Sequence, residues 1–148
     1  MGEGQYVQRH LAFEKAGEFM KARILLIEDN LQNRYLATFL LKQRGHDVFE
    51  AESGPQGLEM AARMHPDLIL LDIQLPGMDG HAVARALKSD LQLQLIPIVA
   101  VTSYAMVGDR EKSLAAGALG YIEKPINPDT FVIEVERFLC PRSEESAS

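Results

Sequence analysis

The sequence predicts an α/β fold, in which a doubly wound parallel sheet of five strands carries helices on both faces. Three observations support this prediction. Short apolar runs alternate with stretches that have the period of an amphipathic helix. Glycine or proline marks many of the boundaries between them. Each connection is long enough to hold a right-handed crossover helix. The apolar runs lie at 24–27, 48–49, 68–71, 98–101 and 120–123.

The run at 68–71 is the strand around which the rest of the prediction is built. Its four consecutive large aliphatic residues follow a proline turn, which is typical of a parallel strand buried on both faces. The run ends in Asp72, and the Pro and Gly residues of the loop 73–80 stop further pairing. Open α/β sheets bind their ligands at the carboxyl ends of central strands, so Asp72 is a candidate functional residue.

The first strand, 24–27, also ends in carboxylates, Glu28 and Asp29. Asn30 can cap the helix that follows, and Gly45 supplies its left-handed stop. The positions of this helix that we expect to be buried are Leu36, Phe39 and Leu40.

The second strand is short, at 48–49, and the helix after it has Ser53 as its N-cap. Pro55 lies near the first turn of this helix, which ends before Pro66. Its expected inward positions are Leu58, Ala61 and Ala62.

The third helix follows the loop 73–80 and fades at 89–90. Pro97 then precedes the β-branched fourth strand, 98–101, which delivers Thr102 to its carboxyl end. The inward positions of the third helix are expected to be Val83, Ala86 and Leu87.

A fourth helix is predicted at about 107–116, where Gly117 closes it, and the fifth strand is predicted at 120–123. Asn127 as cap and Pro128 at the next position start the last helix. Its apolar stripe comprises Phe131, Val135, Phe138 and Leu139.

The common strand order for five doubly wound strands is 2-1-3-4-5, with the switch point between strands one and three. This order places Glu28, Asp29 and Asp72 side by side. It also brings Thr102 and Lys124 to the same edge from strands four and five.

These side chains suggest a metal-assisted phosphoryl site. Three crowded carboxylates repel one another unless a hard cation joins them, and Mg²⁺ fits best because it binds few carboxylates together with a phosphate. The Thr102 hydroxyl and the Lys124 ammonium could each meet a phosphoryl oxygen. Asp72 would be the nucleophile. Each of these residues alone is more often an ordinary residue at the end of a strand. The interpretation rests on their occurring together at the ends of four strands.

Composition limits the other possibilities. The chain has 148 residues, 47% of them hydrophobic, which is enough for one domain with a real core. A net charge of −6 gives no support for direct nucleic-acid binding. Cys140 is the single cysteine, and no apolar run reaches the roughly 18 residues of a membrane span. We expect no membrane association and a cytoplasmic location.

The ends of the chain differ from the regular part. Residues 1–19 show no sustained period, and Met20 is a second plausible start, so we expect a leader, native or added for expression, or a disordered extension. A short helix from Leu11 to Lys21 is the alternative. The domain is expected at 20–140, and Pro141 stops the last helix before a polar tail, 141–148.

The sequence resembles the receiver domains of two-component response regulators. The motifs that carry the resemblance are ILLIEDN, LILLDIQLPGMDG, IVAVTSYAM and GYIEKPI, in this order between Ala22 and Leu139. The resemblance implies a flavodoxin-like fold and an Asp72 that accepts phosphate from a histidine kinase or a histidine phosphotransfer protein. It implies a cis bond between Lys124 and Pro125. The Mg²⁺ ligands that it implies are Glu28, Asp29, Asp72 and the backbone carbonyl of Gln74.

The resemblance also implies a switch. Tyr121 matches the aromatic that turns inward in this family when the threonine, here Thr102, moves toward the phosphate. Helix four, strand five and helix five, about Met106 to Leu139, would then present a changed surface to an unidentified downstream protein. The motifs look most like single-domain cell-cycle regulators and hybrid-kinase receivers. Glu28 is a mild departure, a common variant of the usual Asp pair.

Other functions remain open from the sequence. An aspartyl-phosphate phosphohydrolase would carry a second Asp where Gln74 stands. A receiver-like binding module that works without phosphate is the third reading, and the full acid, hydroxyl and lysine set argues against it. We expect a phosphoacceptor rather than a classical enzyme, with self-catalysed phosphotransfer and autodephosphorylation. We expect a monomer or a phosphorylation-dependent dimer.

Overall fold

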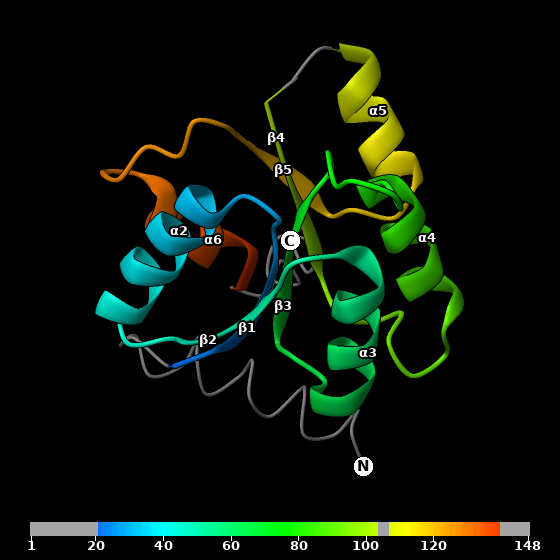
Figure 1. The fold of residues 1–148 in the computed structure, drawn as a ribbon, viewed down its shortest axis with the longest axis horizontal. Coiled ribbons are helices and arrows are strands. Elements are labelled where there is room, and N and C mark those ends of the chain that lie inside the picture. The colour runs from blue at the N-terminus through cyan, green and yellow to red at the C-terminus, as the bar shows by residue number, and fades with distance from the viewer. Residues whose placement is uncertain (1–20, 104–106, 140–148) are drawn as a thin grey trace, which may run out of the picture.

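The computed structural model describes residues 21–103 and 107–139, in which five strands alternate with five helices (Figure 1). The predicted leader, most of the alternative helix, Cys140, Pro141 and the tail lie outside the described residues. The elements are β1 (Arg23–Ile27), α2 (Leu31–Gln43), β2 (Asp47–Ala51), α3 (Gly54–Met64), β3 (Leu68–Asp72), α4 (Gly80–Ser89), β4 (Ile98–Thr102), α5 (Val107–Ala115), β5 (Gly120–Glu123) and α6 (Phe131–Leu139).

The strands form one parallel sheet in the order β2-β1-β3-β4-β5, which confirms the predicted fold class and order. The register aligns the carboxyl ends of the strands. Ile27, the last residue of β1, pairs with Leu71, and Thr102 at the end of β4 pairs with Glu123 at the end of β5. The residues that follow these ends therefore meet at one edge of the sheet.

Helices cover both faces of the sheet: α2 and α6 lie on one side, and α3, α4 and α5 lie on the other (Figure 1). Successive residues of a strand point to opposite faces. Leu26 and Leu70 thus join the core under α2 and α6, while Ile27 and Leu71 join the core under α3 and α4. Both faces of the central strands are buried, as the unbroken apolar runs predicted.

The buried face of α2 differs from the prediction. Phe39 is 49% exposed, and Leu36 and Leu40 are only half-buried. The buried positions are Arg34, Ala37, Thr38 and Leu41. These positions have i, i+3, i+4 and i+7 spacing, so the inward face includes a charged residue that the apolar stripe did not count. The Arg34 guanidinium is tolerated there because backbone carbonyls and a carboxylate satisfy it.

The prediction for α3 is wrong at one position, since Ala62 is exposed while Ala61 is buried and Leu58 packs partly against the core. A glycine sets the face of this helix. A Cβ at Gly57 would overlap the Ile27 side chain, so the helix approaches β1 more closely than a side chain would allow.

The inward face of α4 follows the prediction at Val83 and Leu87, while Ala86 is half-buried. The last helix begins later than predicted. The turn before it begins at Asn127, whose carbonyl accepts from the Thr130 and Phe131 amides and whose Oδ1 accepts from the Asp129 amide as the predicted cap, and α6 runs from Phe131.

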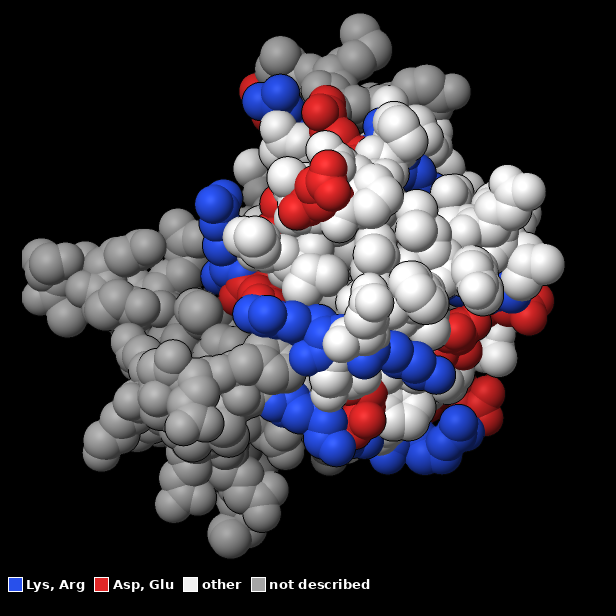
Figure 2. Space-filling model, turned by 90° about the vertical axis from the view of Figure 1, so that its left-hand side faces the viewer, with Lys and Arg blue, Asp and Glu red and all other residues white. Residues whose placement is uncertain are grey.

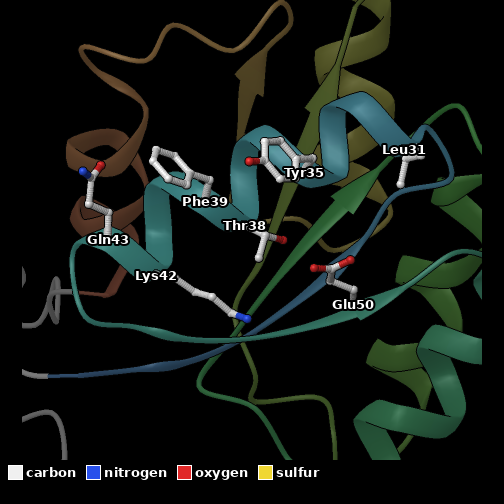
Figure 3. A pocket seen from close by; sticks show the side chains of 7 residues that line it. All are labelled: Leu31, Tyr35, Thr38, Phe39, Lys42, Gln43 and Glu50. Carbon is white, nitrogen blue, oxygen red and sulfur yellow. The ribbon is translucent and has the colours of Figure 1, made fainter.

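The outward side of α2 carries large apolar side chains. Figure 2 turns this side of the molecule toward the viewer and shows a broad uncharged area above a band of Lys and Arg. Leu31, Tyr35 and Phe39 are exposed, and the rings of Tyr35 and Phe39 stack with centroids 6.3 Å apart. An open cavity of about 560 Å³ lies here, lined by Leu31, Tyr35, Thr38, Phe39, Lys42, Gln43 and Glu50 (Figure 3).

No helix within the described ranges has both the length and the apolar character that crossing a bilayer requires.

Candidate functional site

The three predicted carboxylates meet at the carboxyl edge of the sheet. Glu28 and Asp29 directly follow β1, and Asp72 is the last residue of β3, the neighbouring strand. Glu28 and Asp72 are each 2% exposed, whereas Asp29 is exposed. One carboxylate oxygen from each residue lies within 4.8 Å of the other two. The sequence therefore placed these acids correctly.

Lys124 supplies the positive charge of the site. Its Nζ lies 3.0 Å from Glu28 Oε1 and 3.3 Å from Asp72 Oδ1. Its backbone N–H donates to the Thr102 carbonyl over 2.8 Å, which fixes the loop after β5 against the end of β4. The bond from Lys124 to Pro125 is cis, as the resemblance implies.

Burial raises the pKa of Asp72 above its ordinary value of 3.8. The Gln74 backbone N–H, which donates to Asp72 Oδ1 over 2.9 Å, opposes this shift. The nearby Glu28 carboxylate raises the pKa further, and the Lys124 ammonium lowers it. The site thus holds a carboxylate whose negative charge is costly and which any added cation would stabilise.

Backbone hydrogen bonds and one close approach fix the loops around the acids. Glu28 Oε2 accepts from the Asn30 N–H over 3.1 Å. Gly80, at the start of α4, packs directly on the Asp72 strand end, where a Cβ would lie 2.5 Å from the Asp72 carbonyl oxygen. Its N–H donates to the Ile73 carbonyl over 3.0 Å. Only glycine fits at this position, so the loop after Asp72 is held by shape as well as by hydrogen bonds.

The acidic cluster fits Mg²⁺. Octahedral Mg²⁺ with bonds of about 2.1 Å keeps neighbouring ligand oxygens about 3 Å apart and opposite ones about 4.2 Å apart. The oxygens of Glu28, Asp29 and Asp72, which lie within 4.8 Å of one another, would draw closer around the ion to reach these values. The donors are all oxygens, which is the chemistry that Mg²⁺ prefers. The carbonyl of Gln74 stays a predicted ligand.

The two predicted switch residues lie on adjacent strands. Thr102 is 4% exposed at the end of β4. Tyr121 lies in β5, half-buried, and pairs in register with Ala100 rather than with Thr102. The Arg110 guanidinium, from α5, lies 4.9 Å from the centroid of the Tyr121 ring. Arg110 is therefore a neighbour of the predicted switch tyrosine that sequence reasoning missed.

Sequence reasoning also missed Arg34. This side chain, in the first turns of α2, donates to the carbonyl oxygens of Glu28 and Asp29. The hydrophobic pattern gave no sign that this arginine is buried, because it lies between the predicted cap and the predicted apolar stripe of the helix. Its position five residues after Asp29, one helical turn into α2, was the available hint.

A family model described as the response regulator receiver domain matches residues 24–136. The polar-differentiation response regulator DivK of Brucella abortus (strain 2308) is 39% identical over 120 residues, which cover 81% of this chain and 98% of that protein.

Solved structures agree with this match. Chemotaxis protein CheY4 of Vibrio cholerae has a TM-score of 0.77 at 27% identity, with 80% of this chain and 99% of that chain covered. The receiver domain of a sensor histidine kinase from Pseudomonas aeruginosa PAO1, solved with a magnesium ion coordinated in its active-site cleft, has a TM-score of 0.74 at 32% identity, with 81% and 98% covered.

The family match spans the five strands and five helices except Arg23 at the start of β1 and the last three residues of α6, and the curated relative is matched over almost its whole length. The site geometry lies within the matched residues. This chain therefore belongs to the family of response regulator receiver domains.

Proposed function

We propose that Asp72 is the phosphoacceptor of this receiver domain and that phosphorylation requires Mg²⁺ held by Glu28, Asp29, Asp72 and the Gln74 carbonyl. The observation that carries the proposal is the buried Asp72 carboxylate at the end of the central strand, 3.3 Å from the Lys124 ammonium and within 4.8 Å of two further carboxylates. A buried acid in such company is suited to receive an anion only if cations offset the charge.

The donor would be a phosphohistidine, since receiver domains interact with histidine kinases or histidine phosphotransfer proteins. An oxygen of Asp72 attacks phosphorus while the bond from phosphorus to the histidine nitrogen breaks. The imidazole leaves and takes up a proton from water. When bound, Mg²⁺ would offset the negative charge of the phosphoryl oxygens beside the carboxylates.

Lys124 and Thr102 would complete the site. Lys124 Nζ lies near both Asp72 and Glu28, so it can contact a phosphoryl oxygen after a small rotation. Thr102 lies one strand away, at the end of β4, where its hydroxyl can donate to another phosphoryl oxygen. These two residues would convert the new charge into movement of the β4 and β5 loops.

The finer parts of the function follow from this chemistry. The domain would work in the cytoplasm as a phosphoacceptor whose acyl phosphate is formed and hydrolysed within its own site. Phosphorylation would change the surface of α5, β5 and α6 for a downstream protein. A phosphohydrolase is less favoured because an exposed amide side chain, Gln74, stands where a second acid would be required.

Intact mass measurement tests the proposal. The protein is incubated with Mg²⁺ and acetyl phosphate, with Asp72→Asn as the matched variant and excess EDTA as the metal control. We expect the wild type to gain one phosphoryl group and the Asp72→Asn protein and the EDTA sample to gain none. A wild type that gains no mass, or an Asp72→Asn protein that gains as much, would overturn the assignment.

A further inference from the structure

Arg34 hydrogen-bonds the backbone of Glu28 and Asp29, the acidic loop that follows β1. Arg34 belongs to α2, and the residue is 8% exposed. Nη1 donates to the Glu28 carbonyl oxygen over 3.0 Å and to the Asp29 carbonyl oxygen over 3.4 Å. Nε donates to Glu50 Oε1 over 3.1 Å. One guanidinium thus joins the loop after β1 to the edge strand β2.

The two carbonyls belong to the two residues whose carboxylates meet Asp72. Other bonds hold different parts of the loop, and Lys124 contacts the Glu28 carboxylate. The Glu28 N–H donates to the Ala51 carbonyl over 3.0 Å, and the Asn30 N–H donates to the Glu28 side chain. Arg34 therefore holds the backbone carbonyls of both acidic residues at once.

The charge of Arg34 is balanced locally. Glu50 Oε1 forms an ion pair with Nε, and Glu52 Oε2 lies 3.6 Å from Nη2. A buried guanidinium without such partners would be costly, and with two carboxylates its field at the metal site is largely offset. Its influence on the acidic cluster is thus chiefly geometric. Glu50 also lines the cavity beside α2, between β2 and the helix (Figure 3), so the same contact ties that wall to the loop.

We propose that Arg34 is a positioning residue for Mg²⁺ binding, which holds the Glu28–Asp29 backbone so that both carboxylates stay directed toward Asp72. This inference rests on the proposed function of the acidic site. The three carboxylates repel one another, and the repulsion favours conformations in which the loop turns its acids outward. Two hydrogen bonds to consecutive carbonyls oppose that rotation, because they fix the peptide between the two acids.

Only arginine can make this set of contacts. The planar fork presents several N–H groups in fixed directions, so one end can serve two carbonyls while Nε serves Glu50. A lysine at the same position would keep the charge but would have one nitrogen to share among them. The substitution Arg34→Lys therefore separates the geometric role from the charge.

The test is a Mg²⁺ titration of the whole chain, followed by calorimetry or by amide NMR, with no phosphodonor present. The variants are Arg34→Lys and Arg34→Met. The matched control is Arg44→Met, which removes another arginine near the α2 end, whose Nε lies 2.9 Å from Glu136 Oε2. Phosphorylation by acetyl phosphate is then measured as a function of Mg²⁺ concentration.

We expect Kd for Mg²⁺ to rise about tenfold in Arg34→Met and by a smaller factor in Arg34→Lys, and to be unchanged in Arg44→Met. The phosphorylation rate at saturating Mg²⁺ should stay within about twofold of the wild type in both Arg34 variants, with only the required Mg²⁺ concentration raised. Should Arg34→Met fail to fold, Arg34→Lys alone decides.

A purely structural role predicts a different result. If the folded Arg34 variants melt at lower temperature but bind Mg²⁺ as the wild type does, Arg34 only ties α2 to β2 and the inference is wrong. A wild type that binds no Mg²⁺ and gains no phosphoryl group would instead overturn the proposed function itself. The two failures are therefore distinguishable.

Discussion

Lys124 Nζ lies 3.3 Å from Asp72 Oδ1, although their strands, β5 and β3, are separated in the sheet by β4. The long side chain of Lys124 spans this gap and is held between Asp72 and Glu28. Its backbone N–H is fixed on the Thr102 carbonyl. A group bound at Asp72 can therefore pull on the β5 loop through one side chain.

This link predicts the behaviour of Lys124→Ala. The variant should still be phosphorylated, but on the order of tenfold more slowly, because one cation that stabilises the phosphoryl oxygens is lost. Phosphorylation should no longer alter α5, β5 and α6, because the connection to the β5 loop is gone. Acetyl phosphate kinetics and amide NMR measure the two effects. Lys42→Ala, an exposed lysine on α2, is the control. Wild-type shifts across β5 in phosphorylated Lys124→Ala would contradict the link.

The second prediction concerns Mg²⁺ binding and Asp29, the exposed acid of the cluster. Mg²⁺ should raise the melting temperature of the wild type, because it binds the folded state and relieves the crowding of three carboxylates. Asp29→Ala should weaken Mg²⁺ binding by about tenfold or more, because one hard oxygen ligand is removed. Thermal melts across a Mg²⁺ series check this. Asp129→Ala, which removes an exposed acid from the turn before α6, should respond to Mg²⁺ as the wild type does.

The sequence revealed the acidic site because chemistry-bearing residues directly follow apolar strands, and parallel strands align their carboxyl ends. Asp72 and Lys124 needed only the strand order to be brought together. Helix faces were harder to predict. The buried face of α2 includes Arg34, whose burial requires carbonyls that only the folded loop supplies. Helix α3 packs against Ile27 through Gly57, and the spacing of apolar residues in the sequence does not reveal such a close approach.

His46 predicts how stability depends on pH. Its Nδ1 accepts from the Ala22 N–H over 3.1 Å, so the proton lies on Nε2, which donates to Glu136 Oε2 over 2.9 Å. Burial lowers the pKa of His46 below 6.5, and the Glu136 carboxylate opposes this only in part. Protonation would place a second N–H against the Ala22 amide.

Because the unfolded chain binds the His46 proton more readily than the folded one, the unfolded state gains protons first as pH falls. The contribution of His46 to stability is therefore complete above pH 6.5 and is lost as pH falls from 6.5 through the folded pKa. Urea unfolding at a series of pH values measures the slope. His46→Gln should lower the stability by about 1–3 kcal/mol at neutral pH and flatten the slope in this window. An unchanged slope in His46→Gln would assign the pH dependence to other groups.

The last prediction concerns Tyr121 and Arg110, which connect β5 to α5. The guanidinium lies 4.9 Å from the ring centroid, a contact worth about 0.5–1 kcal/mol when partly exposed. Such a contact is weak enough for a phosphoryl group to outweigh, since a charge-assisted hydrogen bond to Thr102 is worth more. We therefore expect phosphorylation to move Thr102 toward Asp72, turn Tyr121 further inward and release Arg110.

Amide and side-chain NMR of the protein with Mg²⁺ and beryllofluoride, a phosphoryl mimic, tests this coupling. Shifts should extend through 107–139, and the Arg110 side-chain signals should lose the ring-current shift that the Tyr121 ring causes. Tyr121→Ala should abolish the Arg110 change while leaving the shifts around Asp72 intact, because only the ring is removed. Arg85→Ala, which removes an exposed arginine of α4, serves as the control and should leave the whole response unchanged. If the wild-type shifts stay confined to the loops around Asp72, the signal leaves the domain at another surface.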